Sequence, residues 1–176
     1  MRDLNATLIQ CELAWEQPED NRRQIGDVIA GLEHRSDLIV LPEMFTTGFS
    51  MNAIGNAEQP CGATQQWLQQ LAVAYDCAIT GSIAVHGDGG VYNRMLFATP
   101  DEVHHYDKRH LFRMGREDEY FTPGESREIF NLGPFRFLPQ ICYDLRFPVF
   151  SRNRGDYDVL YYVANWPAPR QLVWES

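Results

Sequence analysis

The chain is 176 residues long, which predicts a single domain spanning residues 1–176. Its composition, with 44% hydrophobic and 22% charged residues, is typical of a soluble globular protein. The formal net charge of −9 argues against nucleic acid or an anionic membrane as a partner, because both bind basic surfaces.

The sequence carries no pattern typical of export or membrane insertion. Strand-like sequence begins within the first few residues, and no apolar run is long enough to span a bilayer. The four cysteines have no CxxC spacing and are expected to be reduced thiols: Cys11, Cys61, Cys77 and Cys142. We therefore expect a cytoplasmic protein.

The first half of the chain alternates between strand and helix patterns. Residues 4–13 predict a first strand, and residues 21–34 have apolar side chains at helical spacing, with Asn21 as a candidate N-cap. Residues 37–41 form a short continuous apolar run, which is typical of a central strand covered on both faces. A loop rich in Thr, Gly and Ser follows, and then a second helix over residues 63–75.

The middle of the chain predicts antiparallel strands. Residues 77–85 and 91–99 form two strands joined by a hairpin turn at residues 86–90. Residues 103–108 predict a further strand. The long polar and aromatic stretch over residues 110–124 is too charged for the core, and a loop of this length in a compact domain is usually functional.

The last part of the chain returns to a mixed pattern. A hairpin over residues 128–141 turns at Gly133, a helix is expected over residues 149–154, and residues 157–165 predict another buried strand. Residues 170–174 have the pattern of a helix opening after a proline-containing turn. Strands and helices in this order predict an α/β fold with a mixed sheet and outer helices.

Cys142 stands where an apolar strand turns into a helix-like segment. A sharp strand-to-helix turn holds a nucleophile out of the sheet, with backbone N–H groups beside it. A helix N-terminus also lowers the pKa of a thiol toward the thiolate, so Cys142 is a candidate nucleophile of high reactivity. The alternative is a buried structural cysteine, which is the commoner fate of a free Cys.

Other polar residues also stand just past the ends of predicted strands, where open α/β sheets bind ligands: Glu43, Lys108, Asn165 and Trp166. A carboxylate directly after a buried apolar strand is costly unless it is paired or functional. Taken alone, Glu43 is better explained by a helix N-cap or a loop salt bridge, and Lys108 by a solvated loop lysine.

Three segments together resemble the signatures of the nitrilase (carbon–nitrogen hydrolase) superfamily, in the order in which that family carries them: Leu41-Pro42-Glu43-Met44-Phe45, Tyr106-Asp107-Lys108-Arg109-His110-Leu111 and Ile141-Cys142-Tyr143-Asp144-Leu145-Arg146-Phe147-Pro148. The resemblance runs from the first strand through Trp166. Within the superfamily, the residues of these segments are most similar to those of the ω-amidase branch, which includes bacterial amidases that act on ω-amides of 2-oxo dicarboxylic acids. Asn165-Trp166-Pro167 resembles the pocket-lining loop of that branch, and Tyr92-Asn93 resembles its structural asparagine.

The resemblance implies a role for each matching residue. Glu43 is the expected general base, Lys108 the cationic stabiliser and Cys142 the nucleophile. A second glutamate is expected beside the site, and either Glu117 or Glu119 fits the family's Glu-x-x-Tyr-Phe loop, with Glu117 the first choice. Lys108 and the backbone N–H of Tyr143 are the expected oxyanion donors. No metal and no cofactor are required.

The same resemblance implies a four-layer αββα sandwich of the nitrilase type with mixed sheets. Family members continue beyond the point where this sequence ends, with further strands and a helix. We therefore expect residues 1–176 to be the N-terminal part of a longer family domain, with the C-terminal part missing. A homodimer is the expected assembly of the full-length form.

The function that the resemblance implies is hydrolysis of small linear amides to carboxylate and ammonia through a thioester acyl-enzyme. The expected substrates are ω-amides of 2-oxo dicarboxylic acids, such as 2-oxoglutaramate and 2-oxosuccinamate. The alternative within the superfamily is an N-carbamoyl-amine hydrolase or another amidase. Alternatives of other classes are an inactive binding or assembly domain and a redox-sensing thiol protein.

An ω-amide of a dicarboxylic acid carries a carboxylate that needs a cation. The sequence favours Arg113 or Arg116, in the loop between Lys108 and Glu117, over Arg146. Arg146 is expected to be structural: it stands beside Asp144, and its partner is expected either within the turn or in the first turn of the helix that follows. The expected apolar walls and remaining substrate contacts are Phe112, Tyr120, Asn165 and Trp166.

Overall fold

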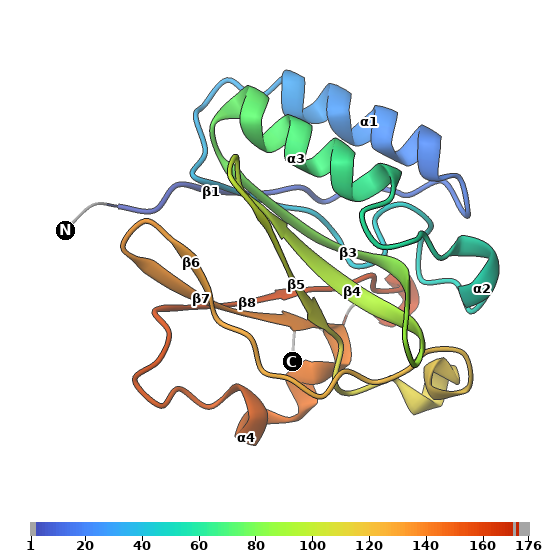
Figure 1. The fold of residues 1–176 in the computed structure, drawn as a ribbon. Helices are drawn as coiled ribbons and strands as arrows, with labels where there is room; N and C mark the ends of the chain where they lie inside the picture. Colours follow the sequence, from blue (N-terminus) through green and yellow to red (C-terminus); the bar gives the residue numbers. More distant parts are fainter. Residues whose placement is uncertain (1–2, 171, 173–176) are drawn as a thin grey trace.

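The computed structural model describes residues 3–170 and 172. Figure 1 shows two β-sheets stacked face to face, with two long helices packed on the outer face of the larger sheet. The larger sheet has the strand order β1-β2-β3-β4-β5 and the smaller sheet the order β6-β7-β8. Both sheets are mixed, as expected from the sequence.

The larger sheet combines helical crossovers and hairpins. Helices connect its first three strands, so these strands are parallel, whereas the last three follow one another directly and are antiparallel. The strands are β1 (Ala6–Leu8), β2 (Leu38–Val40), β3 (Ala78–Gly87), β4 (Gly90–Ala98) and β5 (Val103–Asp107).

The smaller sheet contains β6 (Phe130–Leu132), β7 (Phe135–Ile141) and β8 (Val159–Val163). A tight turn joins β6 to antiparallel β7, and Gly133 takes a φ of +56° there, which glycine adopts without strain. β8 returns parallel to β7 after a crossover. This parallel pair brings the ends of both strands to the same edge of the sheet.

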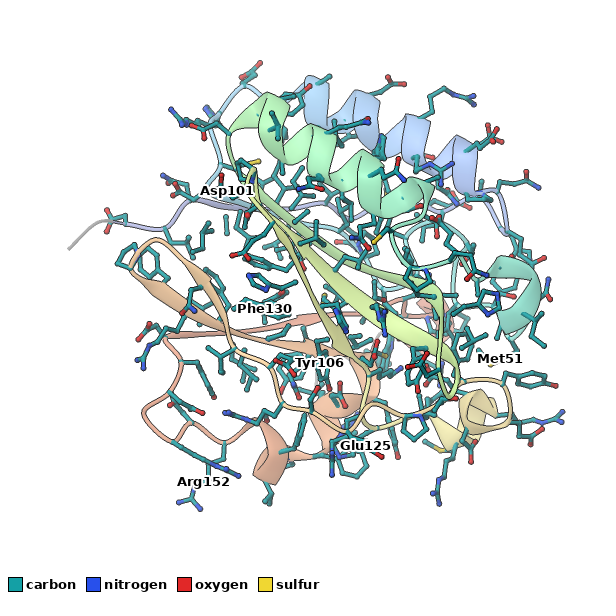
Figure 2. The ribbon with its side chains drawn as sticks, in the orientation of Figure 1. Met51, Asp101, Tyr106, Glu125, Phe130 and Arg152 are labelled. Carbon is teal, nitrogen blue, oxygen red and sulfur yellow. The ribbon has the colours of Figure 1, made fainter. Side chains whose placement is uncertain are left out.

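Two apolar layers hold these parts together. The helices α1 (Pro18–Ala30) and α3 (Ala63–Tyr75) pack on one face of the larger sheet through residues such as Ile25 and Leu68. The second layer lies between the sheets, where Tyr106 of β5 and Phe130 of β6 point into the same space (Figure 2). Since β2 has helices on one face and the smaller sheet on the other, its three residues are all buried, which confirms the prediction of a central strand.

The second helix is confirmed over residues 63–75, but the first helix is placed differently. It begins at Pro18, a residue whose fixed φ suits the first turn of a helix. The predicted capping role of Asn21 is wrong, because Asn21 lies inside the helix and is fully buried. Its side chain bonds to both backbone groups of Ala14 and to the carbonyl of Thr46, and so ties the first loop to the loop after β2.

Other elements are shorter than their patterns predicted. The first strand is only Ala6–Leu8 at an edge of the sheet, and the helix expected over residues 149–154 is the single turn α4 (Pro148–Ser151). The loop after β2 contains an unexpected helix, α2 (Ala53–Asn56). Ala168–Arg170 forms a 3-10 turn, and most of the helix predicted over residues 170–174 lies outside the described residues. Along the described ranges, no helix is long and apolar enough to cross a membrane.

Candidate active site

The residues predicted at strand ends meet at one edge of the two sheets. Glu43 follows β2, Lys108 follows β5 directly and Cys142 follows β7 directly. Glu43 and Lys108 are completely buried, and Cys142 keeps 9% of its surface exposed. Two ionisable groups without solvent contact are stable only if they are paired, so their partners define the site.

Lys108 is the centre of this arrangement. Its Nζ donates to Glu43 Oε1 at 2.8 Å and to Glu117 Oε2 at 2.9 Å, and lies 5.3 Å from the centroid of the Phe49 ring. Burial by itself lowers the pKa of a lysine, but the carboxylates of Glu43 and Glu117 outweigh it, so the pKa of Lys108 is raised. The side chain is therefore a buried cation held between two carboxylates.

The carboxylate of Glu43 is fixed from several directions. Asn93 donates to its Oε1 at 2.9 Å, and the backbone N–H of Asn165 donates to its Oε2 at 3.0 Å. The next residue, Met44, has a φ of +49°, and its N–H bonds to the Ser82 hydroxyl. A non-glycine residue in the left-handed region is uncommon, and such strain is a frequent feature of functional sites.

Glu117, and not Glu119, is the second glutamate beside Lys108. Glu117 is fully buried and also accepts from Asn93 Nδ2 at 3.2 Å and from the Phe112 N–H at 2.6 Å. Burial raises its pKa, while Lys108 opposes the shift. Glu119 lies on the outside of the same turn. The two short 3-10 helices Arg113–Gly115 and Glu117–Glu119 separate these neighbouring carboxylates into opposite environments.

Cys142 occupies the predicted turn, but its pKa is shifted in the opposite direction to the prediction. It opens the 3-10 helix Cys142–Arg146 with a φ of +45°, the strained turn expected of an exposed nucleophile. Burial and the nearby Glu43 carboxylate raise the pKa of the thiol. The prediction of a lowered pKa is wrong because only a short 3-10 turn follows Cys142, whereas the thiol is largely desolvated and faces a carboxylate.

A second buried carboxylate, Asp144, ties the Cys142 turn to the segment after Lys108. Its Oδ2 accepts from the Tyr106 hydroxyl and the Ile141 N–H, and its Oδ1 accepts from the His110 N–H and contacts His110 Nδ1 at 2.7 Å. The structural pairing expected for Arg146 is not found: Arg146 lies exposed and forms no ion pair with the described residues, and the Asp144 carboxylate contacts His110 instead.

A pocket of about 230 Å³ opens over Cys142 and Glu43. Its other walls are mostly aromatic: Trp15, Phe49, Phe112, Tyr143, Asn165, Trp166, Pro167 and Arg170. A cavity of about 380 Å³ is larger, but it is lined by the β6–β7 turn and by loops that carry none of the predicted site residues. The smaller pocket is therefore the one that belongs to the strand-end residues.

The structure separates the predicted substrate contacts into two groups. Phe112, Asn165 and Trp166 line the pocket as predicted. Arg113, Arg116 and Tyr120 do not line it, because the turn that carries Glu117 inward points them to solvent: the side chains of Arg113 and Arg116 are 85% and 67% exposed, and Tyr120 is 44% exposed.

Three of the described pocket residues were not predicted from the sequence: Trp15, Phe49 and Arg170. Trp15 lies in the loop before α1 and Arg170 in the turn after β8, so only the folded chain brings them beside Cys142. The proline-rich spacing before Arg170 was the one available signal. Among the described residues, no group of His, Cys, Asp and Glu is arranged to hold a metal ion.

Comparison with known proteins places this site in a family. Residues 5–176 match the family profile described as carbon-nitrogen hydrolase. The chain belongs to the carbon–nitrogen hydrolase family. This confirms the resemblance seen in the three strand-end segments.

Curated relatives agree with this assignment. The chain is 46% identical over its whole length to the omega-amidase YafV of Yersinia enterocolitica, and the match covers 68% of that relative. It is 31% identical to the 2-oxoglutaramate amidase of Bacillus subtilis, over 96% of this chain and 67% of the relative. The chain is thus an amidase of the carbon–nitrogen hydrolase family.

A solved structure confirms the fold. XC1258 from Xanthomonas campestris, described as a CN-hydrolase superfamily protein with an arsenic adduct in the active site, superposes with a TM-score of 0.95. It is 44% identical, and the match covers 99% of this chain and 69% of that one. The α/β fold of the nitrilase type with mixed sheets is therefore confirmed.

Proposed function

We propose that this carbon–nitrogen hydrolase cleaves ω-amides of dicarboxylic acids, 2-oxoglutaramate and 2-oxosuccinamate among them, through a thioester on Cys142. The observation that carries the proposal is that Glu43, paired with the buried Lys108 that Glu117 also binds, lines one pocket together with Cys142. An amide is a poor electrophile, so its hydrolysis needs a nucleophile, a proton acceptor and charge stabilisation in one place.

The first half of the reaction forms the acyl-enzyme. The raised pKa of Cys142 means that the resting thiol carries its proton, so a base must remove it during attack. Glu43 takes this proton while the sulfur bonds to the amide carbonyl carbon. Glu43 then gives the proton to the amide nitrogen, the carbon–nitrogen bond breaks and ammonia leaves. The product at this stage is a thioester between Cys142 and the acyl group.

The second half returns the enzyme to its starting state. Glu43 takes a proton from water, and the hydroxide attacks the thioester carbonyl. The carbon–sulfur bond breaks, the carboxylic acid leaves, and Glu43 returns the proton to the Cys142 sulfur. The net change is amide plus water to carboxylate and ammonium, with no redox change.

Charge stabilisation is assigned to Lys108 and to the backbone N–H of Tyr143. Both tetrahedral intermediates place negative charge on the former carbonyl oxygen, and preorganised donors in a dry site stabilise it strongly. Glu117 keeps Lys108 charged and in place, and Asn93 bonds to both Glu43 and Glu117 and so fixes the distance between them. Neither Glu117 nor Asn93 transfers a proton in this scheme.

The test measures ammonia release from 2-oxoglutaramate, together with the intact mass of the protein after rapid acid quenching. We expect ammonia at a rate proportional to enzyme and an added acyl mass on the peptide that contains Cys142. Cys142→Ala should remove both signals, with Cys77→Ala as the matched control. Hydrolysis of N-carbamoyl amines without action on ω-amides would favour the other amidase branch, and no turnover of either class would contradict the proposal.

A further inference from the structure

The pocket contains one charged side chain that the proposed chemistry does not use. Among the described residues that line it, only Glu43 and Arg170 carry a charge, and Glu43 is matched by Lys108. The remaining walls are mostly apolar. A cation in such a pocket makes it favourable for a ligand that has both an amide end and an anionic end.

Arg170 is exposed, and its guanidinium lies close to two aromatic rings of the pocket. Its Cζ lies 5.3 Å from the centroid of the Phe112 ring and 5.4 Å from that of Trp166. The indole N–H of Trp166 donates to the Arg170 carbonyl at 2.8 Å, which anchors the turn. Among the described residues none accepts a hydrogen bond from the Arg170 side chain, so its five N–H donors are available to a ligand. These donors match the two oxygens of a carboxylate.

The other candidate arginines have carboxylate partners outside the pocket. Arg116 forms two hydrogen bonds with Glu119, at 2.9 Å and 2.6 Å, and Arg113 lies 3.6 Å from Asp118. Arg170 takes part in no ion pair with the described residues. It is also the arginine that shares the pocket with Cys142.

We infer that Arg170 binds the carboxylate of the substrate and so selects amides that carry a second, anionic end. The inference rests on the proposed function, since it assumes that the amide carbonyl is placed against Cys142. The pocket volume of about 230 Å³ suits a short linear acid amide, because pockets for drug-sized ligands begin at about 300 Å³. Arg170 thus determines specificity and takes no part in the bond-breaking steps.

The experiment uses the full-length protein and compares its activity on two amides with the same number of carbon atoms. One is glutaramate, the monoamide of a dicarboxylic acid, and the other is the neutral valeramide. The quantity measured is kcat/KM for each, and the ratio of the two is the selectivity. Arg170→Met keeps a stem that packs on the rings and removes the charge, whereas Arg170→Lys keeps the charge and removes the planar fork. Arg113→Met and Arg116→Met are matched controls with the same change of charge outside the pocket.

We expect Arg170→Met to lower the selectivity for glutaramate by about 10- to 100-fold, which is the usual effect of losing a charge-assisted hydrogen bond. The loss should lie mainly in KM. Arg170→Lys should retain part of the selectivity, and the two control variants should keep it. Far-UV circular dichroism shows whether each variant is folded. If Arg170→Met does not fold, the selectivity of Arg170→Lys is compared with that of the wild type instead.

Four outcomes overturn the inference. Equal losses on both amides in Arg170→Met and Arg170→Lys would make Arg170 a structural residue. A selectivity loss of the same size in Arg113→Met or Arg116→Met would place the carboxylate in the loop instead. A wild type that hydrolyses both amides without preference would overturn this inference and leave amide hydrolysis intact, whereas no turnover of either amide would overturn the proposed function and this inference with it.

Discussion

Two sets of ion pairs share one short turn of the chain and differ in almost every physical respect. Lys108 bridges Glu43 and Glu117 without solvent contact, whereas Arg116 and Glu119 meet on the surface with half or more of each side chain exposed. The two glutamates are separated by one residue. Glu117 and Glu119 are therefore not distinguished by their residue type or local sequence. They differ because the 3-10 turn directs the Glu117 carboxylate inward and the Glu119 carboxylate to solvent.

The difference lies in how completely the charges are satisfied. In the buried set, both oxygens of Glu43 and of Glu117 accept hydrogen bonds, from Lys108, Asn93 or a backbone N–H. Removing one partner from such a set leaves an uncompensated buried charge, which is strongly destabilising. In the exposed set, water replaces a lost partner, so little changes. Stability and activity should respond very differently to equivalent substitutions in the two sets.

Lys108→Met should have the largest effect. It leaves Glu43 and Glu117 facing each other in a dry site and removes the proposed oxyanion cation. We expect the free energy of unfolding to fall by about 3–5 kcal/mol and kcat/KM on ω-amides to fall by at least about a thousandfold. Urea denaturation and ammonia release measure the two quantities.

Arg116→Met is the matched control for Lys108→Met, because it also removes one cation that pairs with a glutamate of the turn Glu117–Glu119. Its denaturation midpoint should stay within measurement error of the wild type. If both variants lose the same stability, the buried set is no more strongly coupled than the exposed one, and the comparison fails.

Glu117→Gln and Glu119→Gln are the same substitution two positions apart, the first in the buried set and the second in the exposed set. Glu117→Gln keeps the shape of a side chain that binds Lys108 but removes its charge. We expect about a 10- to 100-fold loss of kcat/KM, because Lys108 is then less well positioned and its charge-assisted hydrogen bonds are lost. Glu119→Gln should retain wild-type kinetics. Loss of activity in Glu119→Gln alone would mean that the turn is oriented differently during catalysis.

Much of this architecture was predictable because it depends on local pattern. The apolar run of β2 and the helical spacing of α3 are properties of adjacent residues, and the strained turn at Cys142 follows from a strand that meets a helix-like segment. Glu43 and Lys108 stand at strand ends, where ligands bind in α/β sheets, but only the resemblance of the three segments to the family signatures selected them.

The parts that were not predictable depend on long-range packing. Arg170 reaches the pocket only because β8 lies parallel to β7 and ends at the same edge of the sheet. Trp15 reaches it because the loop before α1 lies beside the loop after β2, an arrangement fixed by Asn21. The pKa of Cys142 was predicted in the wrong direction for a related reason, since burial and the Glu43 charge are absent from any local pattern.

The cysteines offer a second buried-and-exposed pair, with a smaller expected effect. Cys61 is exposed, whereas Cys142 is buried and has a raised pKa. Each unit by which a pKa is raised lowers the thiolate fraction near neutral pH by about tenfold, and the thiolate is the species that reacts. With N-ethylmaleimide at pH 7, Cys61 should therefore be labelled at least about tenfold faster than Cys142, the reverse of the order expected from the turn alone.

The pH dependence of labelling tests the cause of this order. Because the pKa of Cys142 lies above that of an ordinary thiol, its labelling rate should continue to increase as the pH is raised above about 9. Glu43→Gln removes one of the two causes of the shift, so it should speed the labelling of Cys142 and leave Cys61 unchanged. Peptide mapping after short exposure gives both rates in one sample, and the unfolded protein supplies the reference in which the two thiols react alike. If Cys142 is labelled first at pH 7 in the folded wild type, a thiolate is present at rest and Glu43 is not needed to remove the proton.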